Sequence, residues 1–211
     1  MEGKVPSGLR EFMPAEVPLV TVEAGSPFRR IGEEVTWCIK MSQNLGSKLP
    51  DKTFNSLKFS NETRTNSAIF LLTKDGESFP HVALLSPYQV VAVNRVKLLV
   101  AVHSASRSCA FLASDGKGTL ILQLEPAVQY VKCRFSESDD KGYSSGEYGE
   151  KLFNATPLEI LEDYSDKAPF VSELRFDETN TYGPYSEGFG RLKKIAEEDT
   201  GREWPSPLPT P

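Results

Sequence analysis

Hydrophobic and polar positions alternate in short blocks through the middle of the chain, from Ser67 to Phe135. Apolar runs of strand length are separated by Gly, Asn, Asp and Pro residues that favour turns. The expected strands are 67–73, 80–86, 89–93, 96–102, 119–124 and 128–135. Short strands at this spacing predict a mainly β fold, an antiparallel barrel or sandwich.

Two connections between these strands are short enough to predict hairpins. Asp75-Gly76 tolerates positive φ and predicts a tight turn between the first two strands. Asn94-Arg95 is all that separates the third strand from the fourth. Glu125-Pro126 ends the strand at 119–124, because proline has no N–H for a sheet ladder.

The regions on either side of this core carry helical patterns. Apolar spacing predicts a helix within 27–44 and a shorter helix or turn within 49–59 that closes one barrel end. Thr156-Pro157-Leu158-Glu159 has the residues of a capping box and predicts a helix that continues to about Asp163. Further strands are expected at 151–153 and 170–176, a mobile loop or lid at 136–150, and a helix at 187–198.

Composition limits the class of protein. The chain has 211 residues, 39% of them hydrophobic, and a net charge of −5, which fits one globular domain with extended ends. The acidic balance argues against a nucleic-acid partner, and no secretory signal or apolar span of about 20 residues is evident. We therefore expect a cytoplasmic protein with no membrane partner. Its expected parts are an N-terminal arm with short helices (1–60), a β-barrel domain (61–180), and a C-terminal helix with a Pro-rich tail (181–211).

The few cysteines and histidines argue against a metal site. Three cysteines are widely spaced, with no Cys-x-x-Cys pair, and the chain has two histidines. Neither a zinc site nor a disulfide framework is expected from this pattern.

One polar loop interrupts the strands just before a predicted helix at 109–113. Its polar side chains belong to His103, Ser104, Ser106, Arg107 and Ser108. A helix N-terminus attracts anions, and an arginine fork suits phosphate oxygens, so the loop is a candidate phosphate site. The alternative is a solvated Ser-rich connection whose arginine makes a surface ion pair. A Ser/His nucleophile needs an orienting carboxylate and an oxyanion hole that the sequence does not locate.

The order of these elements resembles the FMN-binding split-barrel family, the pyridoxamine 5'-phosphate oxidase-like proteins. Leu-Leu-Thr, a Gly turn and Pro80-His81-Val82 match the family's first hairpin, and Ser106-Arg107-Ser108 matches its phosphate loop. The stretch 128–134 is similar to its closing strand. The resemblance covers roughly residues 67–134.

The resemblance implies an antiparallel split β-barrel with helical additions, and a homodimer that holds FMN in the groove between its subunits. It implies that Arg107, Ser106 and Ser108 bind the FMN phosphate, with His103 and Ser104 in the same loop. Leu84, Leu85 and Ser86 would border the isoalloxazine ring through backbone groups. Gln129 would reach the ring or the ribityl chain.

The chain departs from true pyridoxamine phosphate oxidases at the second basic residue near the phosphate. The corresponding positions hold Ser108 and Ser86, and the segment 191–194 has a helical pattern in place of an Arg-rich substrate loop. These departures argue against vitamin B6 oxidation, and we expect an FMN-dependent oxidoreductase of the pyridoxamine 5'-phosphate oxidase-like family whose substrate the sequence does not identify. FMN, another flavin or a deazaflavin would supply the redox chemistry, so no catalytic side chain is assigned. The alternative is a non-catalytic split barrel that binds flavin, haem or deazaflavin.

Overall fold

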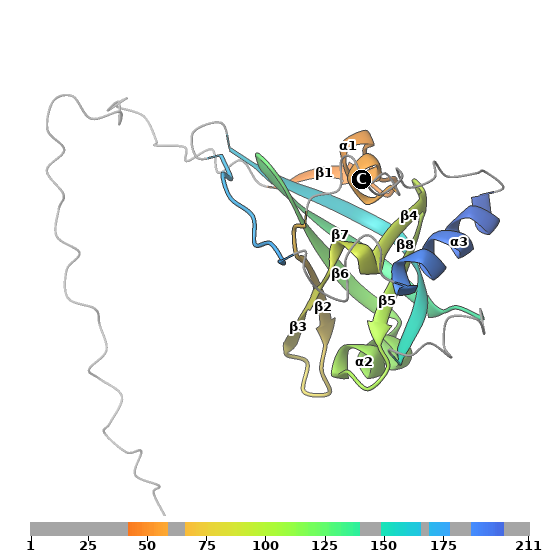
Figure 1. Cartoon of the computed structure of the whole chain (residues 1–211). Helices are drawn as coiled ribbons and strands as arrows, with labels where there is room; N and C mark the ends of the chain where they lie inside the picture. The colour runs from red at the N-terminus through yellow and green to blue at the C-terminus, as the bar shows by residue number, and fades with distance from the viewer. Residues whose placement is uncertain (1–41, 59–65, 140–148, 166–168, 178–186, 201–211) are drawn as a thin grey trace, which may run out of the picture. The chain divides into compact units, whose positions relative to one another are not determined.

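An antiparallel β-sheet dominates this protein, whose computed structural model describes residues 42–58, 66–139, 149–165, 169–177 and 187–200 (Figure 1). The strands are β1 (Gln43–Gly46), β2 (Ile69–Lys74), β3 (Pro80–Leu85), β4 (Val90–Asn94), β5 (Lys97–His103), β6 (Lys117–Leu124), β7 (Ala127–Glu137) and β8 (Glu150–Tyr164). The helices are α1 (Asp51–Leu57), the 3-10 turn η1 (Pro87–Gln89), α2 (Arg107–Asp115) and α3 (Glu187–Thr200).

The sheet has the strand order β3-β2-β6-β7-β8-β5-β4, and β1 also pairs with β8. Every pairing between these strands is antiparallel. β3 and β4 are the edges of the described sheet, so it does not close into a continuous ring. The predicted mainly β, antiparallel fold with flanking helices is confirmed, and the open seam between the edges is the feature of a split barrel.

The residues of the inner apolar cluster show that the sheet curves. Val90 and Ala92 of β4 point into an inner cluster that also contains Leu85 of β3, at the other end of the strand order. Strands from opposite ends of a sheet share one core only when the sheet wraps around that core. Each fully buried Val or Leu in this cluster contributes roughly 1.5–3 kcal/mol.

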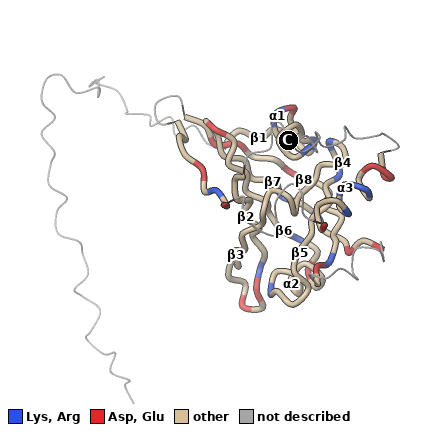
Figure 2. The backbone as a smooth tube through the Cα atoms, viewed as in Figure 1, with Lys and Arg blue, Asp and Glu red and all other residues tan. Residues whose placement is uncertain are grey.

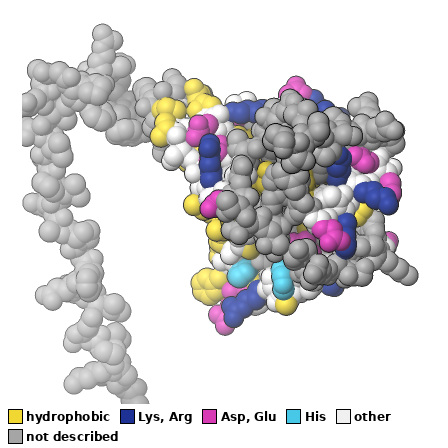
Figure 3. Space-filling view, in the orientation of Figure 1, with side chains coloured by type: hydrophobic (Ala, Val, Ile, Leu, Met, Phe, Trp, Pro, Cys, Tyr) yellow, Lys and Arg dark blue, Asp and Glu magenta, His cyan; other side chains and the backbone are white. Residues whose placement is uncertain are grey.

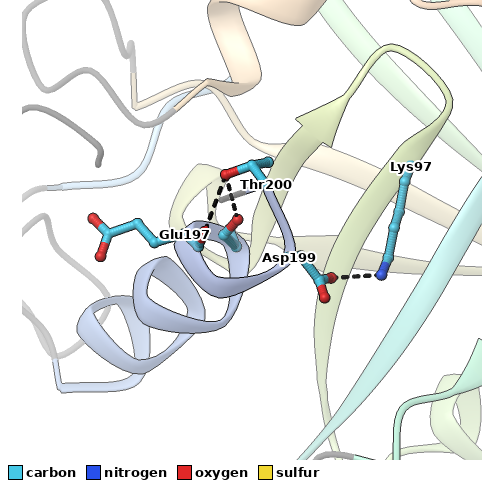
Figure 4. A network of polar contacts seen from close by, with 5 residues as sticks. Lys97, Glu197, Asp199 and Thr200 are labelled. Atoms are coloured by element: carbon cyan, nitrogen blue, oxygen red, sulfur yellow. Dashed lines mark hydrogen bonds and ion pairs between the residues drawn. The ribbon is translucent and has the colours of Figure 1, made fainter. Parts of the chain in front are cut away.

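The outer face of β4, β5 and β8 has its own apolar cluster. Val91, Leu99 and Leu152 lie in this cluster with Phe189 and Leu192 of α3. α3 therefore packs against the outside of the sheet, as Figure 1 shows. Lys97 forms an ion pair with Asp199 at the C-terminal end of the helix, with 2.5 Å between Nζ and Oδ2 (Figure 4).

The two short helices lie at opposite ends of the sheet (Figure 1). Residues Leu49 and Leu57, before and at the end of α1, enter the inner cluster, so the predicted helix within 49–59 closes one barrel end as expected. α2 ends at Gly116, whose φ of 64° is favourable for glycine and allows its N–H to donate to Leu112.

The predicted helix at 156–163 is wrong, because these residues belong to β8. The inward positions change from Phe153 and Ala155 to Ile160, and this change of parity requires a bulge. The ladder slips at this point: Pro157 pairs with Cys133 and Glu159 with Lys132, so Leu158 is the extra residue. Proline is tolerated at a bulge, and the burial available on both sides of the strand outweighs the local helix signal.

Three other sequence predictions need correction. Gln43 and Asn44, expected at the end of a helix, form β1, and the rest of that helix, 27–41, lies outside the described residues. The expected strand 170–176 makes one isolated bridge, between Arg175 and Ser67. In the first hairpin the residue with positive φ is Ser78, at 73°, and Gly76 does not have this conformation.

Charged residues of both signs are distributed over the described part of the chain. Figure 2 shows acidic and basic residues interspersed along the backbone, and both occur at the tip of the β2–β3 hairpin.

Candidate functional site

A pocket of about 350 Å³ lies where the end of β3, the turn η1 and the end of β5 meet. Asn66, Phe176 and Asp177 complete its lining from outside the named strands. Ligand pockets in proteins commonly measure roughly 300–1,000 Å³. The pocket is therefore large enough to hold a ring-sized ligand.

Five of the sequence-predicted site residues line this pocket: Leu84, Leu85, Ser86, His103 and Ser106. Leu84 and Leu85 belong to β3 and His103 to β5, whereas Ser86 and Ser106 are the N-caps of η1 and α2. β3 and β5 are five positions apart in the strand order and meet because the sheet curls. Figure 3 shows the histidine side chains on the same face as a group of exposed hydrophobic side chains.

The β3 side of the pocket is held by a capping box around η1. Ser86 N–H donates to the Gln89 side-chain oxygen over 2.9 Å, and Tyr88 N–H donates to Ser86 Oγ over 3.2 Å. Leu85 is buried beside this turn, whereas Leu84 is 48% exposed on the outside of β3. The sequence contains the signal for this turn, since Ser-x-x-Gln at 86–89 is a capping-box pattern.

A buried carboxylate joins the two sides of the pocket. Gln89 Nε2 donates to Glu150 Oε1 over 2.9 Å, and Glu150 is the cross-strand partner of His103 in the β5–β8 pairing. The Glu150 side chain is buried in the sheet, at 6% exposure. Through Gln89, this carboxylate fixes the position of η1 relative to the end of β5.

His103 presents a hydrogen-bond donor at the edge of the pocket. Its Nδ1 accepts a hydrogen bond from Ala105 N–H over 3.3 Å, and its carbonyl oxygen accepts from Ser106 N–H over 2.9 Å. A neutral imidazole that accepts at Nδ1 carries its proton on Nε2. The exposed side chain of His103 therefore offers an N–H to a ligand.

The predicted phosphate loop forms the start of α2. Ser106 is the N-cap, and its Oγ accepts from Cys109 N–H over 3.1 Å, which leaves the hydroxyl proton for another acceptor. Arg107 is exposed and forms no ion pair with any described residue.

Ser104 and Ser108 differ in their accessibility. Ser104 is exposed, and its N–H donates to Gly149 over 2.7 Å, which ties the loop to the start of β8. Ser108 is 1% exposed, and its Oγ has no hydrogen-bond partner in the part of the chain that the structure describes. Its role at a phosphate stays a prediction, because the hydroxyl lies beneath the surface.

Gln129 lies away from the pocket. It is 1% exposed, accepts a hydrogen bond from Thr53 of α1, and donates to Glu162 Oε2 over 2.7 Å. The structure thus gives Gln129 a place in the contact between α1 and the sheet. Its predicted contact with the flavin stays a prediction.

The sequence interpretation missed Asn66, Tyr88, Gln89 and Phe176 as pocket residues. Asn66 and Phe176 come together through a backbone hydrogen bond, from Phe176 N–H to the Asn66 carbonyl, over 2.9 Å. More than a hundred residues separate them in the sequence, so no local pattern could have indicated the pairing.

Other chemistry has little support in the described residues. Burial raises the pKa of the Cys133 thiol to about 12 and also raises that of Cys109, so neither is a reactive thiolate at neutral pH. No group of three metal-ligating side chains occurs in the described ranges. The helices among them are all too short or too polar to cross a bilayer.

The structure is similar to split-barrel proteins. A candidate pyridoxamine 5'-phosphate oxidase from Lactobacillus delbrueckii has 16% identity and a TM-score of 0.45, over 56% of this chain and 98% of that one. A variant of HupZ from Group A Streptococcus has 8% identity and a TM-score of 0.43, over 54% and 98%. HutZ, a haem storage protein from Vibrio cholerae, has 15% identity and a TM-score of 0.35, over 44% and 82%.

Comparison of the sequence alone finds no relatives. No family model matches the chain, and no curated protein matches it. A candidate pyridoxamine 5'-phosphate oxidase from Listeria innocua has 10% identity and a TM-score of 0.37, over 44% of this chain and 86% of that one.

Proposed function

We propose that this protein binds FMN in the pocket between β3, η1 and β5 and acts as an FMN-dependent oxidoreductase. The observation that carries the proposal is that the end of β3, which follows the hairpin motif, and Ser106 of the Ser-Arg motif line one pocket. Neither motif alone is specific for flavin binding. Their meeting at one pocket supports a shared binding site better than their order in the sequence does.

The residues at the start of α2 fit a phosphate group. Arg107 is exposed with no ion pair among the described residues, and Ser106 retains a hydroxyl proton to donate. Both lie at a helix N-terminus, where backbone N–H groups favour an anion. Leu84, Leu85 and Ser86 offer an apolar edge with backbone groups for a ring. FMN would supply the hydride chemistry, and the chain would hold and orient it.

The His103 tautomer favours a flavin over haem as the ligand. In the neutral imidazole, acceptance at Nδ1 from Ala105 N–H leaves the proton on Nε2. An N–H can donate to a phosphate or a ring carbonyl, whereas an iron ligand must offer a lone pair. The non-catalytic haem-binding alternative thus requires His103 to give up its contact with Ala105.

We propose further that the active form is a homodimer. The sequence resemblance implies a cofactor groove between subunits, and Val82 and Leu84 are about half exposed on the β3 edge beside the pocket. A second copy over this edge would cover these side chains and one side of the ligand.

A titration of the purified protein with FMN, followed by quenching of flavin fluorescence, tests the proposal. Arg107→Ala is expected to weaken FMN binding about ten- to a hundredfold, since charge-assisted hydrogen bonds contribute roughly 1.5–3 kcal/mol. Arg134→Ala is the matched control, because Arg134 is also exposed but lies on β7, outside the Ser-Arg loop at the start of α2.

Reduction by a nicotinamide cofactor then separates an enzyme from a binding protein. An oxidoreductase is expected to bleach the flavin absorption and to recover it with an electron acceptor, whereas a storage protein would retain its colour. Equal FMN affinity in the parent protein and Arg107→Ala would contradict the phosphate role. Binding of haem in preference to FMN would contradict the proposed function.

A further inference from the structure

Asn66 places an unused hydrogen-bond donor in the wall of the pocket. The residue is 9% exposed and lines the pocket. Its Oδ1 accepts from the Tyr88 hydroxyl over 3.3 Å. Asn66 lines the pocket and its amide nitrogen has no hydrogen-bond partner among the described residues, so this nitrogen is available to a ligand acceptor.

Two aromatic side chains flank this amide. The Tyr88 side chain is fixed by the hydrogen bond from its hydroxyl to Asn66 Oδ1 and by an edge-to-face contact with Phe189 of α3. The two ring centroids are 4.9 Å apart. Phe176 is 40% exposed and lines the same pocket. Aromatic walls favour flat, apolar rings, which they contact over a large area at little cost in side-chain entropy.

The segment 169–177 holds Phe176 in this position. Phe176 N–H donates to the Asn66 carbonyl, and Ala68 N–H donates to the Leu174 carbonyl over 2.7 Å. Leu174 N–H also donates to the Gln123 side chain over 3.1 Å. The aromatic wall and the amide are therefore parts of one hydrogen-bonded unit.

The charge of this end of the pocket disfavours anions. Asp177 contributes a carboxylate, and among the described residues no Lys or Arg lines the pocket. The cationic group proposed for the phosphate, Arg107, belongs to the α2 end. An anionic substrate group would therefore have no compensating charge beside Asn66.

We infer that Asn66, Tyr88 and Phe176 form a subsite for an uncharged ring compound with a carbonyl oxygen, which accepts a hydrogen bond from Asn66 Nδ2. This names the substrate class of the pocket and rests on the proposed function. It assigns Asn66 to substrate recognition and leaves the redox step to the cofactor.

Three bicyclic probes of similar size test the inference by equilibrium dialysis, with and without saturating FMN. Coumarin has a carbonyl, naphthalene has none, and coumarin-3-carboxylate adds a negative charge. Coumarin is expected to bind about two- to tenfold more tightly than naphthalene, the ratio that one net hydrogen bond supplies. Coumarin-3-carboxylate is expected to bind more weakly than coumarin.

Asn66→Leu is expected to abolish the difference between coumarin and naphthalene while naphthalene binding stays within about twofold of the parent. The ratio of coumarin affinity to naphthalene affinity separates a lost hydrogen bond from a distorted pocket, because a distorted pocket would weaken the binding of both probes. Asn66→Asp keeps the acceptor for Tyr88 and lacks the donor, so it is expected to lose the difference too. Asn154→Leu, on β8 and outside the pocket lining, is the control.

Each other outcome decides against one of the two proposals. Equal binding of coumarin and naphthalene to the parent, an unchanged ratio in Asn66→Leu, or tighter binding of coumarin-3-carboxylate would overturn the subsite. Absence of FMN binding by the parent would overturn the proposed function, and the dialysis without FMN would still decide the subsite.

Discussion

The Gln89 side chain connects two elements at the pocket, the start of η1 and the start of β8. Its oxygen accepts from Ser86 N–H, and its nitrogen donates to the buried Glu150 carboxylate. Both partners are polar groups that folding removes from water, so each needs its hydrogen bond. Residues of this kind stabilise the fold and the shape of the site at the same time.

Gln89→Ala is expected to lower the free energy of unfolding by about 1–3 kcal/mol, because it removes a donor from a buried carboxylate and an acceptor from the Ser86 N–H. Urea unfolding measures this loss, and the same variant is expected to bind FMN more weakly as η1 loosens. Gln43→Ala, at an exposed position of β1, is the control and should change stability by less than about 0.5 kcal/mol. A Gln89→Ala protein as stable as this control would show that the contact contributes nothing.

At the scale of elements, the sequence predicts best where the signal is local. The strands β2 to β7 and the helix α3 have regular apolar periods, and their positions agree with expectation within a few residues. The segment 156–163 fails because its capping box is a real local signal that burial on both sides of β8 overrides. The strand β1 was missed because its four residues are exposed or half-buried and carry no alternation.

The helix α3 offers a test of how an outer element depends on the sheet. Leu192→Ala leaves a cavity against β4 and β5 and is expected to cost about 2–5 kcal/mol, or less if the helix detaches locally. Hydrogen exchange should therefore increase over 187–200 before the sheet is affected. Lys194→Ala, on the exposed side of the same helix, is the control. Equal exchange in the two variants would mean that packing does not hold α3 on the sheet.

At the scale of the whole molecule, the site depends on the curvature of the sheet. The phosphate-loop motif and the end of β3 are recognisable in the sequence, and the pocket contains parts of both. The curl that joins β3 to β5, and the pairing of Asn66 with Phe176, are long-range and leave no local signal. Five of the thirteen residues that line the pocket were therefore predictable from motifs, whereas its aromatic wall was not.

The exposed β3 edge allows a test of the proposed dimer. Val82 is 53% exposed on this edge, and Val82→Glu would bury a charge in an interface between two copies, which costs several kcal/mol. Sedimentation equilibrium is expected to give the mass of two chains for the parent and of one chain for this variant. FMN affinity is expected to fall with the loss of the dimer, since the resemblance implies a groove between subunits. Leu158→Glu places the same charge at a comparably exposed position on β8, 49% exposed, and should leave both measurements unchanged. A parent protein with the mass of one chain would contradict the dimer. If the parent and Val82→Glu also bound FMN with equal affinity, one chain would form the whole site.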